Sequence, residues 1–274
     1  MTVILPHAVL PHASAATLLP SERHPAARPA RPARPVPPAP LSPALSKLLA
    51  RLPVQDDGEA LRQSLFHSGT HFNPDLLTSE AERRARLEGV HAALDRAESL
   101  VFLDTESTGG RNGRLIEVAL VETDVEQNVT GGLHFRCNPH RRSLAGARRV
   151  HGIQDCELEH CPEFAARADE LLEAVRGKTV VIHDRTMDLL WLNRELQAAR
   201  PGAPRFEDRC TVVDSFVLAR AIPSERRRNG LDALLEWYGL GARGGHLDAY
   251  GDAALLSRVF FELWWDLDEW LYGE

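Results

Sequence analysis

The sequence has few cysteines, no long apolar run and no surplus of positive charge, and each shortage excludes a class of protein. Four cysteines among 274 residues do not form a disulfide framework, so a reducing, cytoplasmic setting is expected. No apolar stretch approaches the length of a membrane span, and the mildly apolar start of the chain lacks the charged region of a signal peptide. The formal net charge is -7, so any nucleic-acid binding must rest on local basic residues.

Composition divides the chain into three regions. Residues 1–43 are rich in Ala, Pro and Arg and cannot bury enough surface to order themselves, so a disordered tail is expected. Residues 44–98 are predicted to form a helical extension that ends in an amphipathic helix over 79–99, capped by Ser79. Residues 99–274 form the predicted main domain.

The main domain is predicted to be an α/β fold built on a mixed five-stranded sheet. Its first three strands are expected to run antiparallel, because short turns join them. The last two strands alternate with helices, which favours parallel strands with helices on both faces of the sheet. The expected strands span residues 100–103, 115–121, 131–137, 178–182 and 211–213. The expected helices span residues 143–149, 162–176, 186–199, 215–221, 231–238 and 252–272.

Four acidic residues stand where these elements begin or end. Asp104 and Glu106 follow the first strand, and residues two apart in a strand point to the same face. Two adjacent carboxylates repel each other unless a cation lies between them, and oxygen ligands suit Mg²⁺ or Mn²⁺. Asp188 lies in the first turn of the helix after the fourth strand, and Asp252 opens the last helix. The alternative at each position is a solvated acid, or one that favours a helix N-terminus.

Four motifs along residues 99–262 carry a resemblance to a known family. They are DTESTG at 104–109 with LIEV at 115–118, VHGI at 150–153, HDRTMD at 183–188, and LDAL at 231–234 with His246 and Asp252 beyond it. In this order they resemble the DEDD 3'→5' exonucleases of the RNase H-like fold, in the subclass with a catalytic histidine. The VHGI stretch is typical of the epsilon-like branch, the proofreading subunits of bacterial DNA polymerases.

The resemblance implies phosphodiester hydrolysis with two divalent metal ions, Mg²⁺ or Mn²⁺. The implied metal ligands are four carboxylates: Asp104, Glu106, Asp188 and Asp252. The implied catalytic residues are Glu106 and His246, and His246 would take the proton from the attacking water. Hydroxyl side chains of the first motif would contact the substrate: Thr105, Ser107 and Thr108.

Two departures from the family pattern affect these assignments. Asp184 stands where the second motif usually has Asn, and Met187 where it usually has Phe. His246 precedes Asp252 by six residues, whereas the family's histidine usually precedes it by five. We expect a loop before the last helix to absorb the extra residue, with a bulge at Gly251. His183 is the alternative base, although packing at the strand end is the more ordinary role for it.

Arginines near the third motif are candidates for phosphate contacts. Three of them form a run before its helix and one follows it: Arg226, Arg227, Arg228 and Arg243. We hypothesise that they supply the local positive charge that the acidic chain lacks as a whole. A solvated loop is the alternative.

The resemblance also implies partners. The expected substrate is single-stranded or frayed DNA with a free 3' end, in proofreading or repair. The stretch QSLF at 63–66 is similar to short peptides that bind bacterial sliding clamps, so a clamp or a polymerase is a candidate partner. Aromatic residues of the last helix form either core or a homodimer face: Phe260, Phe261, Trp264, Trp265, Trp270 and Tyr272.

Two other functions and one other kind of metal site remain open at this point. The chain could be a catalytically impaired nucleic-acid-binding module of the same fold, or an exoribonuclease. A zinc site could also be imagined from His151, Cys156, His160 and Cys161, although their spacing fits no common zinc motif.

Overall fold

The structure is a computed structural model that describes residues 79–243 and 248–273. The predicted tail over 1–43, the QSLF stretch at 63–66 and the predicted base His246 lie outside the described residues. None of the helices in the described part of the chain is both long and apolar enough to cross a membrane.

The described residues form a mixed five-stranded sheet in the order β3-β2-β1-β4-β5. Its strands are β1 (Ser99–Ser107), β2 (Leu115–Asp124), β3 (Val129–Arg136), β4 (Thr179–Ile182) and β5 (Thr211–Asp214). β1 pairs antiparallel with β2 and parallel with β4, β2 pairs antiparallel with β3, and β4 pairs parallel with β5. The predicted fold class, an α/β fold on a mixed five-stranded sheet, is confirmed. The structure adds that β1 is the central strand.

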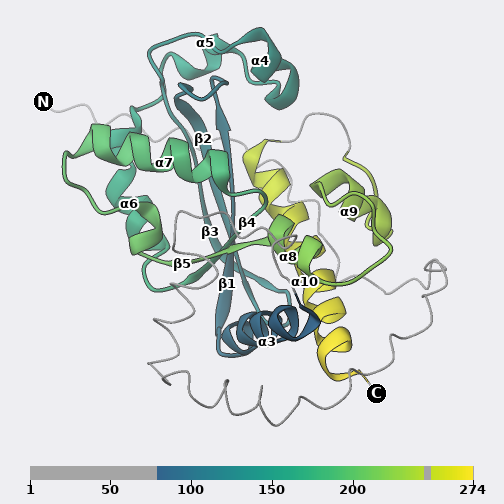
Figure 1. The fold of residues 1–274 in the computed structure, drawn as a ribbon. Helices are drawn as coiled ribbons and strands as arrows, with labels where there is room; N and C mark the ends of the chain where they lie inside the picture. Colours follow the sequence, from purple (N-terminus) through teal and green to yellow (C-terminus); the bar gives the residue numbers. More distant parts are fainter. Residues whose placement is uncertain (1–78, 244–247, 274) are drawn as a thin grey trace, which may run out of the picture. The chain divides into compact units, whose positions relative to one another are not determined.

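Helices cover both faces of this sheet (Figure 1). The helical elements are α3 (Glu80–Asp95), α4 (Ala145–His151), α5 (Asp155–Leu158), η3 (Phe164–Ala166), α6 (Ala168–Ala174), α7 (Thr186–Ala199), η4 (Phe206–Asp208), α8 (Ser215–Ala221), α9 (Leu231–Trp237) and α10 (Ala249–Tyr272). β1 alternates its side chains between two cores, as the strand period requires. Leu100 and Phe102 pack with α3, α8, α9 and α10, whereas Val101 and Leu103 pack with α6 and α7.

The aromatic residues of α10 mostly enter the first of these cores. Phe260 and Phe261 are buried, and their ring centroids lie 5.7 and 6.0 Å from that of Phe102. Trp264 and Trp270 pack against the same core, while Trp265 and Tyr272 remain exposed. α3, which falls in the predicted extension, also packs there through its Leu87, Val90 and Leu94. It therefore shares a core with the main domain.

Some element boundaries differ from the predicted ones. The predicted helix over 162–176 is divided into η3 and α6 at Arg167, whose backbone leaves the helical range at φ -115° and ψ -4°. α5 was not predicted, because it has only four residues and no hydrophobic period. β1 continues past Leu103 to Ser107, so its two acids lie within the strand rather than after it. This last difference bears directly on the site.

Candidate active site

Three carboxylates converge beside the central strand. Asp104 and Glu106 point to the same face of β1, as the strand period predicts, and Asp252 faces them from the first turn of α10. Oxygen atoms of all three lie within 4.8 Å of one another. The packing of α10 on β1 thus brings together residues that are almost 150 positions apart in the chain.

The fourth predicted ligand, Asp188, joins the cluster from the other face of β1. It is buried in the first turn of α7, directly after β4. Thr105 lies between the two β1 acids and points to the opposite face, where its Oγ1 donates a hydrogen bond of 2.6 Å to Asp188 Oδ1. Repulsion from Asp188 also raises the pKa of Asp104. Asp188 is not part of the group of described carboxylates whose oxygens all lie within 4.8 Å of one another.

Burial raises the pKa of all four carboxylates. Burial, followed by repulsion from Asp188 and Glu106, places the pKa of Asp104 well above its usual range. Burial, followed by repulsion from Asp252, raises the pKa of Glu106 to about 8. Burial raises the pKa of Asp188 to about 7 against the hydrogen bond from Thr105. Burial also raises the pKa of Asp252 to about 6, although the cationic Arg243 opposes this shift.

The raised pKa values make the stability of the metal-free protein depend on pH. A carboxyl group whose pKa is higher in the folded chain than in the unfolded chain stabilises the fold only while it is protonated. In EDTA, this cluster should therefore lower the melting temperature as the pH rises from about 5 to about 8. Added Mn²⁺ should raise the melting temperature most at the alkaline end, because metal ligands must be deprotonated.

The contribution of the cluster is isolated by comparing the wild type with an Asp104→Asn variant over the same pH range. The metal-free variant should lose less stability than the wild type between the two pH limits. If melting temperature falls equally steeply with pH in the two proteins, the inferred repulsion between Asp104 and its neighbouring carboxylates is contradicted.

The residues present fit a divalent cation. All four ligand candidates are carboxylates, and hard divalent ions prefer oxygen ligands. Asp252 Oδ1 is buried and has no hydrogen-bond partner within the described protein, so a lone pair is available to an ion. A cation would also offset the repulsion that raises the pKa values of the cluster.

Arg243 supplies part of that compensation within the protein. Its Nη1 lies 3.0 Å from Asp252 Oδ2, and its Nε lies 3.1 Å from Asp232 Oδ1 at the start of α9. Arg243 therefore contacts a predicted metal ligand directly. Arg243 was predicted to flank the substrate groove. In the structure it lies beside a predicted metal ligand, and its guanidinium pairs with the carboxylates of Asp252 and Asp232.

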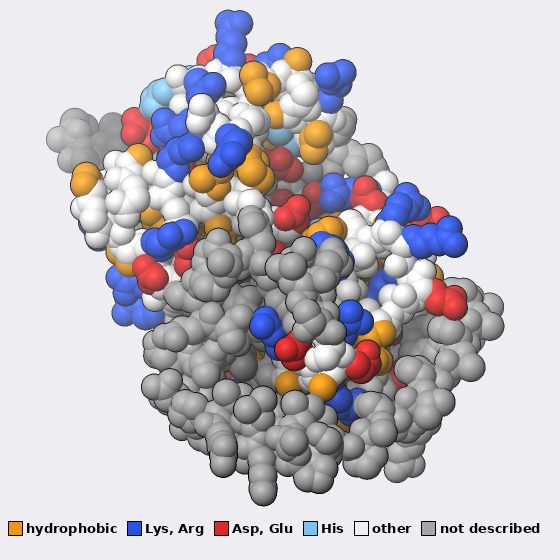
Figure 2. Space-filling view, in the orientation of Figure 1, with side chains coloured by type: hydrophobic (Ala, Val, Ile, Leu, Met, Phe, Trp, Pro, Cys, Tyr) orange, Lys and Arg blue, Asp and Glu red, His pale blue; other side chains and the backbone are white. Residues whose placement is uncertain are grey.

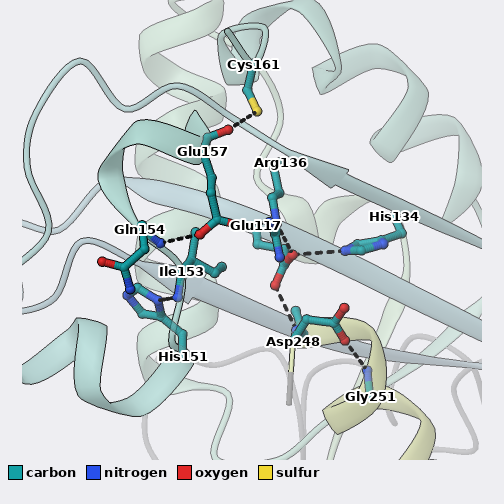
Figure 3. A network of polar contacts seen from close by, with 11 residues as sticks. Glu117, His134, Arg136, His151, Ile153, Gln154, Glu157, Cys161, Asp248 and Gly251 are labelled. Atoms are coloured by element: carbon teal, nitrogen blue, oxygen red, sulfur yellow. Dashed lines mark hydrogen bonds and ion pairs between the residues drawn. The ribbon is translucent and has the colours of Figure 1, made fainter. Parts of the chain in front are cut away.

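Glu117 anchors the N-terminus of α10, a role that the sequence motifs do not predict. It is 0% exposed in β2, and its Oε2 accepts a 2.9 Å hydrogen bond from the backbone N–H of Ala249. Its Oε1 lies 3.1 Å from His134 Nε2 and 2.7 Å from Arg136 Nε (Figure 3). Burial alone would raise the pKa of Glu117, but these hydrogen bonds together lower it. Glu117 is thus ionised and fixes the helix that carries Asp252.

The first turn of α10 is more regular than the sequence indicated. The helix begins at Ala249, three residues before the predicted start, because Asp248 caps it by accepting a 2.9 Å hydrogen bond from the N–H of Gly251. Gly251 is consequently a helical residue, and the predicted bulge at Gly251 is wrong. Asp252 lies in the first helical turn rather than opening the helix.

The predicted substrate hydroxyls are engaged within the protein. Thr105 bonds Asp188, the Oγ of Ser107 accepts the N–H of Gly109, and the Oγ1 of Thr108 accepts the N–H of Arg114. All three residues are buried. Their side chains shape the loop after β1 and hold a carboxylate. Contact of these three residues with substrate stays a prediction.

His183, the alternative base, packs at the end of β4. Its Nδ1 lies 2.9 Å from Ser215 Oγ, and its ring meets Phe216 edge-on at 5.7 Å. Burial lowers its pKa to about 4, so it is neutral at physiological pH. These contacts give it the packing role that the sequence favoured.

Two of the four candidate zinc ligands make other contacts. His151 Nδ1 accepts the N–H of Ile153, and Cys161 Sγ donates to the carbonyl oxygen of Glu157 at 3.4 Å (Figure 3). Neither of the possible ligand groups found among the described residues includes His151, Cys156, His160 or Cys161.

The arginine run before α9 does not form one exposed patch. The side chain of Arg226 is only 1% exposed, and its Nη1 lies 2.8 Å from Asp266 Oδ2 and 2.6 Å from Tyr238 Oη. Its Nη2 donates to the carbonyl oxygen of Ala219 at 3.0 Å. The structure therefore corrects the hypothesis that Arg226 contacts a phosphate, because its guanidinium joins α8, α9 and α10. Arg227 and Arg228 are exposed.

Arg226→Ala should lower the free energy of unfolding by about 3 kcal/mol, because it removes the buried cation that faces Asp266. Chemical denaturation measures this loss. Arg227→Ala is the matched control, since it removes the neighbouring exposed arginine and should change stability by less than about 0.5 kcal/mol. Equal, small effects for both variants would show that the buried network contributes little.

The fold and the site together define a class of enzyme. A mixed sheet whose central strand carries acids, joined by acids from two helices, is suited to metal-assisted hydrolysis of a phosphodiester. Residues 101–260 match the RNase_T exonuclease family, and the chain belongs to this family. The enzyme is a 3'→5' exonuclease by this membership, and the family depends on divalent metal ions.

Proteins of similar sequence include subunits of bacterial DNA polymerase III. The chain is 34% identical over 168 residues to the DNA polymerase III subunit epsilon of Rickettsia felis, which covers 60% of this chain and 72% of that protein. It is 33% identical over 172 residues to the same subunit of Escherichia coli K12, with 60% and 70% covered. Among solved structures, an E. coli ExoI complex with single-stranded DNA aligns at a TM-score of 0.49 and 20% identity, over 63% of this chain and 40% of that chain.

Proposed function

We propose that this enzyme removes nucleotides from single-stranded or frayed DNA 3' ends by two-metal hydrolysis. The observation that carries the proposal is the group of Asp104, Glu106 and Asp252, assembled from β1 and α10, with Asp188 of α7 held beside it by the hydrogen bond from Thr105. The DNA substrate follows from the named relatives, which are subunits of a DNA polymerase. Residues 99–274 form the proposed exonuclease domain.

The proposed mechanism divides the work between the carboxylates and a histidine. Bound Mg²⁺ or Mn²⁺ ions would polarise the scissile phosphate and lower the pKa of a water molecule. Asp104, Glu106 and Asp252 would hold these ions, while Thr105 orients the fourth ligand, Asp188, through its 2.6 Å hydrogen bond. Glu117 keeps Asp252 in place by fixing the first turn of α10. His246 is the proposed base that takes the proton from the water.

A direct digestion tests the proposal. Labelled single-stranded DNA, double-stranded DNA and single-stranded RNA should be incubated in parallel with Mg²⁺ or Mn²⁺, with label at either end to report the direction of cleavage. Single-stranded DNA should be shortened fastest, from its 3' end. Faster digestion of RNA would change the substrate to RNA, and binding without any digestion would support an impaired binding module.

The same relatives suggest that the enzyme serves a polymerase in trans, in proofreading or repair. Pull-down of a bacterial replicative polymerase subunit by the full-length chain tests this partnership. A variant with Leu65 and Phe66 replaced by Ala tests the clamp-like stretch at 63–66 separately, because binding to a clamp should disappear while binding to the polymerase remains.

A further inference from the structure

Helix α4 presents a surface that the rest of the described protein hardly covers. Of its seven residues only His151 is buried. Two apolar side chains at its ends, Leu144 and Val150, are 53% and 65% exposed. Two exposed apolar side chains on one short segment are available for contact with a ligand.

The charge of this surface is opposite to that of the whole chain. Residues 138–151 contain four arginines, two histidines and no acidic residue, whereas the formal net charge of the chain is -7. Arg148 pairs with Asp155 at 2.9 Å, and Arg141 donates to the carbonyl oxygen of Asn112 at 3.1 Å. Arg142 and Arg149 are exposed on the same segment. Here we call residues 141–150 the α4 surface.

The α4 surface borders the active site. The N–H of Leu144 donates a 2.8 Å hydrogen bond to the carbonyl oxygen of Thr108, at the end of the first motif. Gly109 has φ +91°, and a Cβ there would lie 2.9 Å from the Cβ of Ala147, so α4 packs directly on the loop after β1. Figure 2 shows basic and hydrophobic side chains gathered over the α4 region, beside a hollow in which acidic side chains are visible.

The basic α4 surface lies beside an acidic site, and a DNA substrate is itself negatively charged. The carboxylates of the site repel a polyanionic strand, and bound metal ions would offset that repulsion at the site alone. The phosphates farther along the strand need cations of their own, and arginine is well suited to bind them. The exposed aliphatic side chains beside these arginines, Leu144 and Val150, can contact the unstacked bases of a single strand.

We propose that the α4 surface binds the single-stranded DNA immediately 5' of the nucleotide that is cleaved. Arg142 and Arg149 contact its phosphates, and Leu144 and Val150 contact its bases. The proposal rests on the proposed DNA substrate, and it adds the path of the strand that the acidic site alone does not define.

The test uses a double variant, Arg142→Ala with Arg149→Ala. The matched control is Arg176→Ala with Arg200→Ala, which removes two exposed arginines outside the α4 surface, one before β4 and one at the C-terminus of α7. Binding of a labelled oligothymidylate is measured by fluorescence anisotropy over a series of salt concentrations. Ca²⁺ replaces Mg²⁺ to prevent cleavage.

The α4 variant should bind the oligonucleotide about tenfold more weakly, which corresponds to one charged hydrogen bond. The slope of log K against log salt should become shallower by roughly 0.7 for each phosphate that the variant no longer neutralises. The control variant should match the wild type. Unchanged affinity and slope in the α4 variant would overturn the proposal.

A small substrate distinguishes the α4 surface from the catalytic site. The p-nitrophenyl ester of thymidine 5'-monophosphate carries no upstream strand, so the ratio of oligonucleotide cleavage to ester hydrolysis should fall in the α4 variant. An equal fall for both substrates would overturn the proposal, because α4 would then act through the site. Salt-dependent binding that requires Arg142 and Arg149, in a wild type that cleaves neither substrate, would support the surface and refute the proposed function.

Discussion

Asp104→Asn should reduce cleavage of single-stranded DNA to about a thousandth of the wild-type rate, the effect expected when a charge that stabilises the transition state is removed. Asp104 lies at the centre of the cluster and interacts with all three of the other carboxylates. Removing its charge therefore removes a ligand that no neighbouring residue replaces. The rate is measured with Mn²⁺ and Mg²⁺ in excess, so that weaker metal binding does not by itself explain the loss.

The same variant should remain folded, and this separates a loss of chemistry from a loss of structure. Without metal its melting temperature should equal or exceed that of the wild type, because one of four mutually repelling charges is gone. The increase in melting temperature on adding Mn²⁺ should be smaller than in the wild type. Asp169→Asn, at an exposed position in α6, is the control for both measurements. Wild-type cleavage by Asp104→Asn would refute the site assignment.

Local patterns predicted much of the fold because many boundaries are set by neighbouring residues. The predicted helices over 186–199 and 215–221 coincide with α7 and α8. α8 begins where Asp214 accepts hydrogen bonds from the N–H groups of Phe216 and Val217, a signal that lies entirely within the sequence around it. Elements of this kind need no tertiary information.

The site shows where local patterns are insufficient. A charged residue ordinarily ends an apolar strand, so β1 was expected to stop before Asp104, yet Asp104 and Glu106 pair with Ala119 and Glu117 of β2 inside the sheet. The sequence around β1 does not reveal this position, because α10 and α7 bring Asp252 and Asp188 to these acids only in the folded chain. The prediction that Asp104 and Glu106 lie side by side, with Asp252 close to them, is confirmed.

Two buried charged residues depend on partners far away in the chain. Arg226 reads as part of an exposed basic run, but its partner Asp266 lies 40 residues later in α10. In the sequence, Glu117 is a motif residue within a strand. Its role as an acceptor for the N-terminus of α10 depends on the N–H of Ala249, which is 132 residues away in the chain. An acid within an otherwise buried apolar strand was the available signal for Glu117.

His246→Ala should lower kcat by roughly a hundred- to ten-thousand-fold, the usual contribution of a positioned general base. The segment that contains His246 joins Arg243 to Asp248, and the structure places both of these residues beside Asp252 or the helix that carries it. A one-residue offset within a helix would rotate a side chain by about 100°. The helix that carries Asp252 begins at Ala249, three residues after His246 in the sequence.

Metal binding and pH dependence show whether this loss is due to the base. His246→Ala should keep the wild-type increase in melting temperature with Mn²⁺, because the four carboxylates are unchanged. With Mn²⁺ in excess, its kcat should also lose the acidic limb that protonation of a histidine base produces in the wild type. His140→Ala removes an exposed histidine and is the control. A loss of only a few-fold, with the acidic limb intact, would show that His246 is not the base and that the extra residue has moved it out of reach of the water.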